Sequence, residues 1–128
     1  MKQKVFSNHA PKPIGPYSQA IEHNGILFIS GQIGIDTKTN CITNKGIEEE
    51  GKIIMENLKA ILLKADYSFS DIVKCSIFLT DMSYFKKINN IYLSYLTDPY
   101  PARETVAVKS LPKDANVEIS AIAIKNTL

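Results

Sequence analysis

Two charged side chains near the end of the sequence, Arg103 and Glu118, are the residues best suited to chemistry. A guanidinium group presents a planar set of N–H donors that holds a carboxylate through two hydrogen bonds, which a lysine cannot reproduce. Pro99 and Pro101 restrict the backbone just before Arg103, so the arginine enters its strand from a stiff segment. The alternative for Arg103 is an ordinary surface position.

Glu118 lies in a run of valine, isoleucine, alanine and serine. A carboxylate in such surroundings needs a partner or a raised pKa, and either property suits a group that orients or deprotonates water. A structural ion pair with one of the lysines is the alternative interpretation of Glu118. The two residues together predict a site that holds a small carboxylate beside a water molecule.

The sequence places the two residues on strands that we expect to be neighbours. A short β-branched strand, 105–108, follows Arg103, and the turn residues of 111–116 reverse the chain into a second strand, 117–124. Alternation along this second strand puts Glu118 on one face with a serine and two isoleucines, while the opposite face is entirely apolar. Both faces of the strand are therefore expected to be covered.

The rest of the chain predicts a single α+β domain spanning residues 1–128. Asn24-Gly25 separates two apolar runs, which is the strongest short-range signal for a β-hairpin, and helical periodicity appears in two later segments. The elements expected before 105–108 and 117–124 are strands at 4–7, 17–22 and 26–30, a helix at 47–65, a strand at 73–80 and a helix at about 83–96. The order β-β-β-α-β-α-β-β favours a mixed sheet with two helices on one face. Two helices leave the other face bare, so a partner chain is expected to cover it.

Gly31 and Gly34 interrupt the chain directly after the predicted hairpin. The lysine and further glycine of a phosphate-binding loop are missing, so a nucleotide site is not indicated. We interpret the pair as a bend or bulge where the backbone must approach another group closely.

Composition excludes several classes of function. The net charge of +2, with scattered lysines, gives no support for nucleic-acid binding, and no apolar run is long enough to span a membrane. Cys41 and Cys75 are expected to be reduced thiols, and His9 and His23 have no ligands at metal-binding spacing. We expect a cytoplasmic protein without a metal site, with organelle import left open.

Several segments resemble motifs of the Rid protein family, also called the RidA or YjgF family. They are Gly15-Pro16-Tyr17-Ser18-Gln19-Ala20, Ile29-Ser30-Gly31-Gln32-Ile33-Gly34, Pro101-Ala102-Arg103, and Leu111-Pro112-Lys113 followed by Val117-Glu118-Ile119. The resemblance extends over nearly the whole chain. It implies a chorismate-mutase-like fold and a homotrimer with clefts between its subunits.

The resemblance also implies roles for individual residues. Arg103 would grip the substrate's carboxylate, and Glu118 would be associated with the attacking water. The residues implied to line the ligand cleft are Tyr17, the Ser30 hydroxyl, the Gly31 backbone N–H and Asn89. Many Rid proteins have cysteine where this chain has Thr105, so thiol chemistry is lost there. The backbone carbonyl of Thr105 can still orient a water.

The function implied by the resemblance is a 2-iminobutanoate/2-iminopropanoate deaminase. It would hydrolyse reactive imines and enamines, released by pyridoxal-phosphate enzymes, to 2-oxo acids and ammonia. No cofactor is expected, because an imine is already electrophilic and positioning with modest acid–base help suffices. One alternative is a non-catalytic module that binds or senses a 2-oxo acid. RNA cleavage, a role attached to some relatives, is less favoured because neither paired histidines nor a basic groove is visible.

Overall fold

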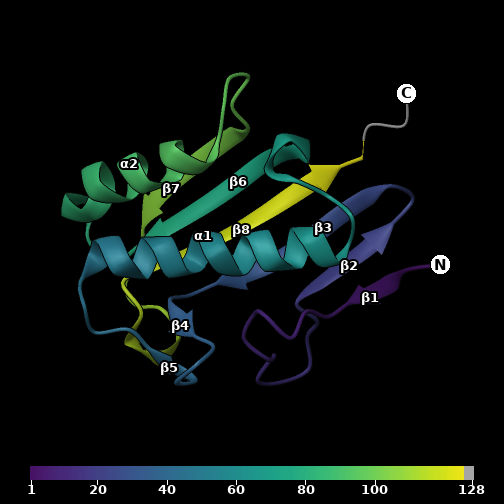
Figure 1. The fold of residues 1–128 in the computed structure, drawn as a ribbon. Coiled ribbons are helices and arrows are strands. Elements are labelled where there is room, and N and C mark those ends of the chain that lie inside the picture. The colour runs from purple at the N-terminus through teal and green to yellow at the C-terminus, as the bar shows by residue number, and fades with distance from the viewer. Residues whose placement is uncertain (126–128) are drawn as a thin grey trace.

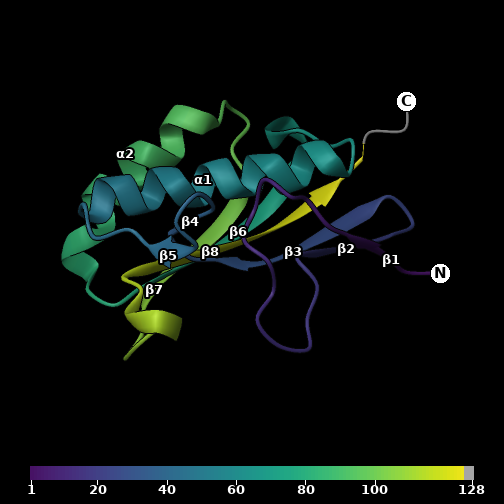
Figure 2. The same cartoon turned by 60° about the horizontal axis from the view of Figure 1, so that its bottom comes forward.

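A computed structural model describes residues 1–125 and places both long helices on one face of a six-stranded sheet (Figures 1 and 2). The strands are β1 (Gln3–Val5), β2 (Ala20–His23), β3 (Ile26–Gln32), β4 (Ile35–Asp36), β5 (Cys41–Ile42), β6 (Ile72–Leu79), β7 (Ala102–Ala107) and β8 (Val117–Ile124), and the helices are α1 (Ile47–Lys64) and α2 (Phe85–Tyr95). The predicted α+β class is confirmed. The predicted order lacks only β4 and β5, two-residue strands that pair with each other outside the main sheet.

The hairpin formed by β2 and β3 follows the prediction closely. Its turn residues Asn24 and Gly25 have φ values of 52° and 76°. Positive φ at both central residues is the requirement of a type I′ turn, whose twist matches that of the flanking strands. The hairpin therefore fixes where β3 begins, and β3 carries Ser30 and Gly31 at its far end.

The core lies between the sheet and α1. The buried side of α1 supplies Ile54, Leu58 and Ile61, each fully buried, as its apolar periodicity predicts. They pack in one cluster with the inward side chains of β3, β6 and β8. None of the helices within residues 1–125 is both long enough and apolar enough to cross a membrane.

Neither of the two long helices covers the opposite face of the sheet (Figure 2). Along β8, Val117, Ile119, Ala121 and Ala123 are buried, whereas the residues between them are half-buried or exposed. On this open face, Phe28 and Ile124 are each 47% exposed. The expected apolar surface on both sides of the sheet is thus present in the structure.

The expectation that the strand of Arg103 neighbours the strand of Glu118 is wrong. The sheet order is β1-β2-β3-β8-β6-β7, so β6 lies between β7 and β8. α2 forms the crossover between β6 and β7, which therefore pair in parallel and leave β7 at the sheet edge. β8 has small and branched apolar residues on its buried face and fills the central position between β3 and β6.

Candidate functional site

Arg103 lies on β7 and is held by side chains of α2. One of its NH1 hydrogens is donated to Asn89 Oδ1 at 2.7 Å. Its guanidinium carbon is 5.0 Å from the ring centroid of Tyr92 and 5.6 Å from that of Phe85. Two aromatic rings and one amide therefore set the direction of the guanidinium group, while the side chain remains exposed to solvent.

Asn89 and Thr105 lie beside Arg103, and these three residues form the Arg103 group. Asn89 is half-buried and contacts the arginine directly, so α2 and β7 bring two predicted site residues together. Thr105 points to the same side of β7 as Arg103, because side chains two positions apart share a strand face. Its Oγ1 atom is buried and has no hydrogen-bond partner. The hydrogen-bonding capacity of this hydroxyl is therefore unused within the described residues.

Glu104, between these two residues, points to the opposite side of β7. Its carboxylate pairs with Lys74 Nζ at 2.8 Å and accepts a hydrogen bond from Ser76. The hydrogen bond from Lys74, followed by the one from Ser76, lowers the pKa of Glu104. The negative charge next to Arg103 in sequence is thus paired and faces away from the guanidinium group.

Glu118 lies at a separate cavity of about 560 Å³ on the open side of the sheet. The loop between β1 and β2 and the turn before β8 both extend to this side (Figure 2). Among the residues that line the cavity are Lys12, Tyr17, Ser30, Gly31, Lys113 and Glu118. Four of the predicted site residues therefore share one cavity.

The carboxyl group of Glu118 is in close contact with Gly31. A Cβ atom built on Gly31 would lie 2.7 Å from Cδ and Oε2 of Glu118, so a glycine is needed for this approach. A register shift in the pairing of β3 with β8, between Ile29 and Gln32, produces the bulge that makes the approach possible. The predicted close backbone approach is confirmed. Burial raises the pKa of Glu118 above its ordinary value of 4.5.

Ser30 and Tyr17 form part of the cavity wall and already use some of their hydrogen-bonding capacity. The Ser30 hydroxyl donates to the backbone oxygen of Ser18 at 2.6 Å. The Tyr17 hydroxyl accepts from the backbone N–H of Ile14 at 3.3 Å. Toward a ligand, Ser30 is therefore an acceptor, and Tyr17 keeps its proton for donation.

Within one chain, the Arg103 group and the Glu118 cavity do not meet. In the sheet register, Arg103 is opposite Cys75, which is buried under the helices. Glu118 is opposite Phe78 on the same middle strand, three residues further along. Residues an odd number of positions apart on one strand point to opposite faces of the sheet. Arg103 therefore projects to the helix side and Glu118 to the open side.

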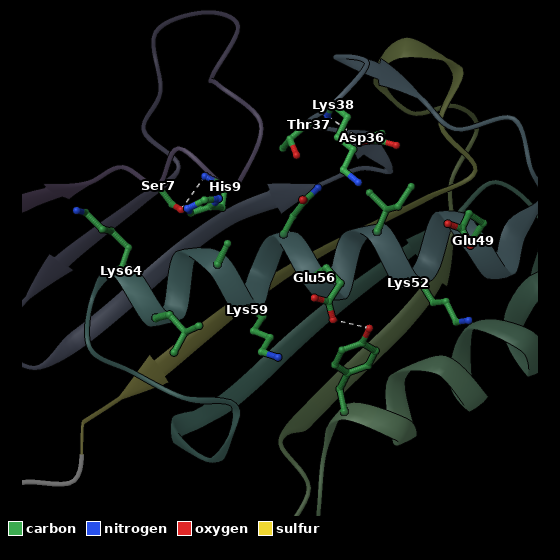
Figure 3. Close-up of a pocket in the computed structure, with 15 residues that line it drawn as sticks. Ser7, His9, Asp36, Thr37, Lys38, Glu49, Lys52, Glu56, Lys59 and Lys64 are labelled. Carbon is green, nitrogen blue, oxygen red and sulfur yellow. Dashed lines mark hydrogen bonds between the residues drawn. The ribbon is translucent and has the colours of Figure 1, made fainter.

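A larger cavity than the one at Glu118 lies elsewhere. A groove of about 1000 Å³ runs along α1, beside the loops that carry Ser7, His9 and Asp36 to Lys38 (Figure 3). None of the predicted site residues lines it, and its lysines alternate with acidic side chains such as Asp36 and Glu56. The groove is open and mixed in charge. The smaller cavity is the better candidate because it contains a half-buried carboxyl group with a raised pKa.

Some residues that build the cavity were not predicted from the sequence. Gln19, fully buried, accepts from the Ser7 backbone N–H at 2.6 Å and donates to the Pro11 carbonyl at 2.9 Å. These bonds hold the proline-rich loop that carries Lys12. Lys113 reaches the cavity from a turn in which its φ is 56°. The prolines and the Asp114-Ala115-Asn116 segment predict both loops from the sequence, but they do not indicate that the two loops line the same cavity.

Metal binding has no candidate cluster in the described part of the chain. Residues 1–125 contain no group of three or more histidine, cysteine, aspartate or glutamate side chains arranged to hold an ion. His9 lines the groove along α1, and His23 ends β2.

Comparisons with known proteins match this chain along nearly its whole length. The model of a family described as Endoribonuclease L-PSP matches residues 7–125. A RutC family protein of Pyrococcus horikoshii is 49% identical over 125 residues, which covers 98% of this chain and 99% of that protein. A 2-iminobutanoate/2-iminopropanoate deaminase of Dermatophagoides farinae is 40% identical over 123 residues, or 96% of each chain. The crystal structure of the Rid family protein YyfA from Yersinia pestis superposes with a TM-score of 0.95, at 42% identity, over 98% of this chain and all of that one.

Proposed function

Because the chain belongs to the YjgF/RidA (Rid) family, we propose that it is a hydrolase that deaminates short 2-imino acids to 2-oxo acids and ammonia. Its substrates would be reactive imines and enamines such as 2-iminobutanoate and 2-iminopropanoate. The name of the Dermatophagoides farinae relative supports this chemistry. The observation that carries the proposal is the half-buried carboxyl group of Glu118, whose pKa is raised by burial, at the wall of a cavity.

The chemistry needs a water and a place for its proton. Glu118 holds the water and takes one proton from it as the water oxygen bonds to C2 of the imine. The nitrogen receives a proton in return, and collapse of the resulting carbinolamine releases ammonia and leaves the 2-oxo acid. A carboxyl group with a raised pKa can both accept the proton from the water and donate a proton to the nitrogen.

Arg103 supplies the substrate anchor in this proposal. Its guanidinium group binds the carboxylate of the imino acid, and the contact with Asn89 fixes its direction. The unpartnered hydroxyl of Thr105 lies on the same face of β7 as Arg103, and in this proposal the backbone carbonyl of Thr105 orients the attacking water. Ser30, the Gly31 N–H and Tyr17 complete the opposite wall.

Since Arg103 and Glu118 project from opposite faces of one sheet, the complete site takes one half from each of two copies of the chain. The exposed apolar residues Phe28, Val106 and Ile124 form the open face that a second copy would bury. In a closed ring of copies, every chain makes the same pair of contacts. The family resemblance implies a ring of three, so the proposed assembly is a homotrimer with three clefts between subunits.

The test is a competition assay. An amino-acid oxidase generates 2-iminopropanoate from alanine beside semicarbazide, and semicarbazone formation is followed with and without this protein. We expect the trapped product to fall in proportion to the protein added, and an Arg103→Ala variant to lose this effect. Unchanged trapping with the wild-type protein contradicts the proposed activity.

A binding module without turnover is the second outcome that this assay separates. If trapping is unchanged while calorimetry detects binding of pyruvate, the site holds a 2-oxo acid and does not react. Cleavage of RNA has less support, because neither His9 nor His23 lies at the Arg103 group or the Glu118 cavity.

A further inference from the structure

Glu50 is a buried carboxylate outside the residues discussed so far. It lies in the first turn of α1 beside Glu48 and Glu49, and such acids favour a helix N-terminus through the helix dipole. Glu50, however, is only 1% exposed. Burying a carboxylate is costly unless hydrogen bonds compensate it. The carboxylate of Glu50 must therefore have hydrogen-bond partners within the protein.

Both carboxylate oxygens of Glu50 bind a single residue, Asn116. The Asn116 backbone N–H donates to Oε1 at 2.8 Å, and its side-chain Nδ2 donates to Oε2 at 3.1 Å. Gly34 makes room for this arrangement, because a Cβ atom there would lie 2.5 Å from Cγ of Glu50. The first turn of α1 is thereby tied to a residue 66 positions later in the sequence.

Asn116 joins the turn Pro112–Asp114 to the start of β8. Within this turn, Lys113 and Asp114 each have a φ of 56°, a left-handed conformation that non-glycine residues adopt only where their surroundings hold it. Pro112 and Lys113 line the cavity, and Glu118 follows two residues after Asn116. The position of Asn116 therefore influences two parts of the cavity wall, one formed by Pro112 and Lys113 and the other by Glu118.

We propose that Glu50 is a positioning residue for the site: by clamping Asn116, it holds Lys113 at the cavity wall and sets the start of the strand that carries Glu118. The charge of Lys113 then lies where an anionic substrate enters the cavity. Glu50 itself acts only through Asn116 and does not line the cavity. The kinetic part of this inference rests on the proposed deaminase activity, whereas its structural part does not.

The experiment compares Glu50→Ala and Glu50→Gln with Glu48→Ala as a matched control. Glu48 is an exposed neighbour on the same turn, in a long 3.9 Å contact with Lys87. We expect Glu50→Ala to lower kcat/KM by about tenfold or more, since small displacements of reacting groups have large kinetic effects. Glutamine keeps an acceptor for the Asn116 N–H, so Glu50→Gln should restore most of the activity, and Glu48→Ala should match the wild type.

A double variant separates positioning from a general loss of stability. If Glu50 acts through the turn, the losses caused by Glu50→Ala and Lys113→Ala should overlap, so that the double variant is little worse than Glu50→Ala alone. Fully multiplicative losses, or wild-type kinetics in a folded Glu50→Ala protein, overturn the inference. Should Glu50→Ala fail to fold, Asn116→Ala takes its place, because it removes only the side-chain half of the clamp. It should lower kcat/KM, and its loss should overlap with that of Lys113→Ala; wild-type kinetics or fully multiplicative losses overturn the inference.

Amide hydrogen exchange supplies a readout that does not depend on activity. The Asn116 N–H should exchange faster in Glu50→Ala than in the wild type, while the amide of Leu58 in the core of α1 should be unchanged. Unaltered exchange at Asn116 overturns the inference. If the wild-type protein shows no deamination, the proposed function fails, and the exchange measurement still decides whether Glu50 holds the turn.

Discussion

Replacing Gly31 by alanine tests the role of Glu118 while the glutamate itself is not substituted. The added methyl group would lie 2.7 Å from Cδ and Oε2 of Glu118, against the 3.4 Å at which ordinary contacts begin. Gly31 does not have a positive φ, so alanine fits its backbone. The strain is relieved when the carboxyl group moves by about 0.7 Å. Because the moving atoms are the end of a flexible side chain, the fold should survive.

A shift of this size is large for a catalytic group. A misplacement of about 1 Å costs on the order of 100-fold in rate, so we expect Gly31→Ala to lose roughly 10- to 100-fold in kcat/KM in the semicarbazide competition assay. Thermal unfolding should change little.

Gly25→Ala is the matched control for Gly31→Ala. Gly25 has a φ of 76° in the hairpin turn, and no atom lies within 4 Å of the position of its Cβ. Alanine in this left-handed conformation should cost roughly 1–2 kcal/mol of stability, with turnover per folded molecule unchanged. Wild-type turnover by a folded Gly31→Ala protein would refute the assignment of Glu118 to the reaction.

Three further predictions concern the anchor, the core and the carboxyl group. Arg103→Lys keeps the charge but loses the planar fork, so KM should rise roughly tenfold while the melting temperature stays the same; an unchanged KM argues against a carboxylate anchor. Leu58→Ala should cost about 2–5 kcal/mol in urea unfolding, whereas Leu63→Ala, at a side chain 63% exposed, should change stability by less than about 0.5 kcal/mol. Glu118 should titrate above 4.5 in carbon-13 NMR, because burial raises its pKa. Its protonated form then stabilises the fold fully below pH 4.5, and this contribution is lost as the pH rises through the raised pKa. A pKa at or below 4.5 would contradict this.

The local elements could be predicted because each has a local cause. The Asn24-Gly25 turn, the apolar periodicity of α1 and the alternation along β8 are properties of short segments. The neighbours of β7 could not be obtained in this way. A turn such as 111–116 is compatible with a hairpin, and only the packing of α2 as a crossover shows that β7 pairs with β6.

The candidate site could be predicted residue by residue, but not in its geometry. Family motifs identify Arg103 and Glu118, yet a motif does not say which face of a sheet a side chain takes. Nothing local in the sequence distinguishes Glu50 from its neighbours Glu48 and Glu49, because its partner Asn116 is remote in sequence and its burial depends on tertiary structure. Such long-range contacts leave no periodic signal.

The most direct test of the account uses two inactive variants together. Arg103→Ala and Glu118→Gln are co-expressed with different tags, mixed assemblies carrying both tags are purified, and imine deamination is measured. If the two residues act from different copies of the chain, every mixed ring of three has one wild-type pair among its three sites, and the activity of the purified mixed assemblies returns to about one third of the wild-type value. If mixed assemblies form and remain inactive, the site does not combine Arg103 of one copy with Glu118 of another, and the central claim is wrong.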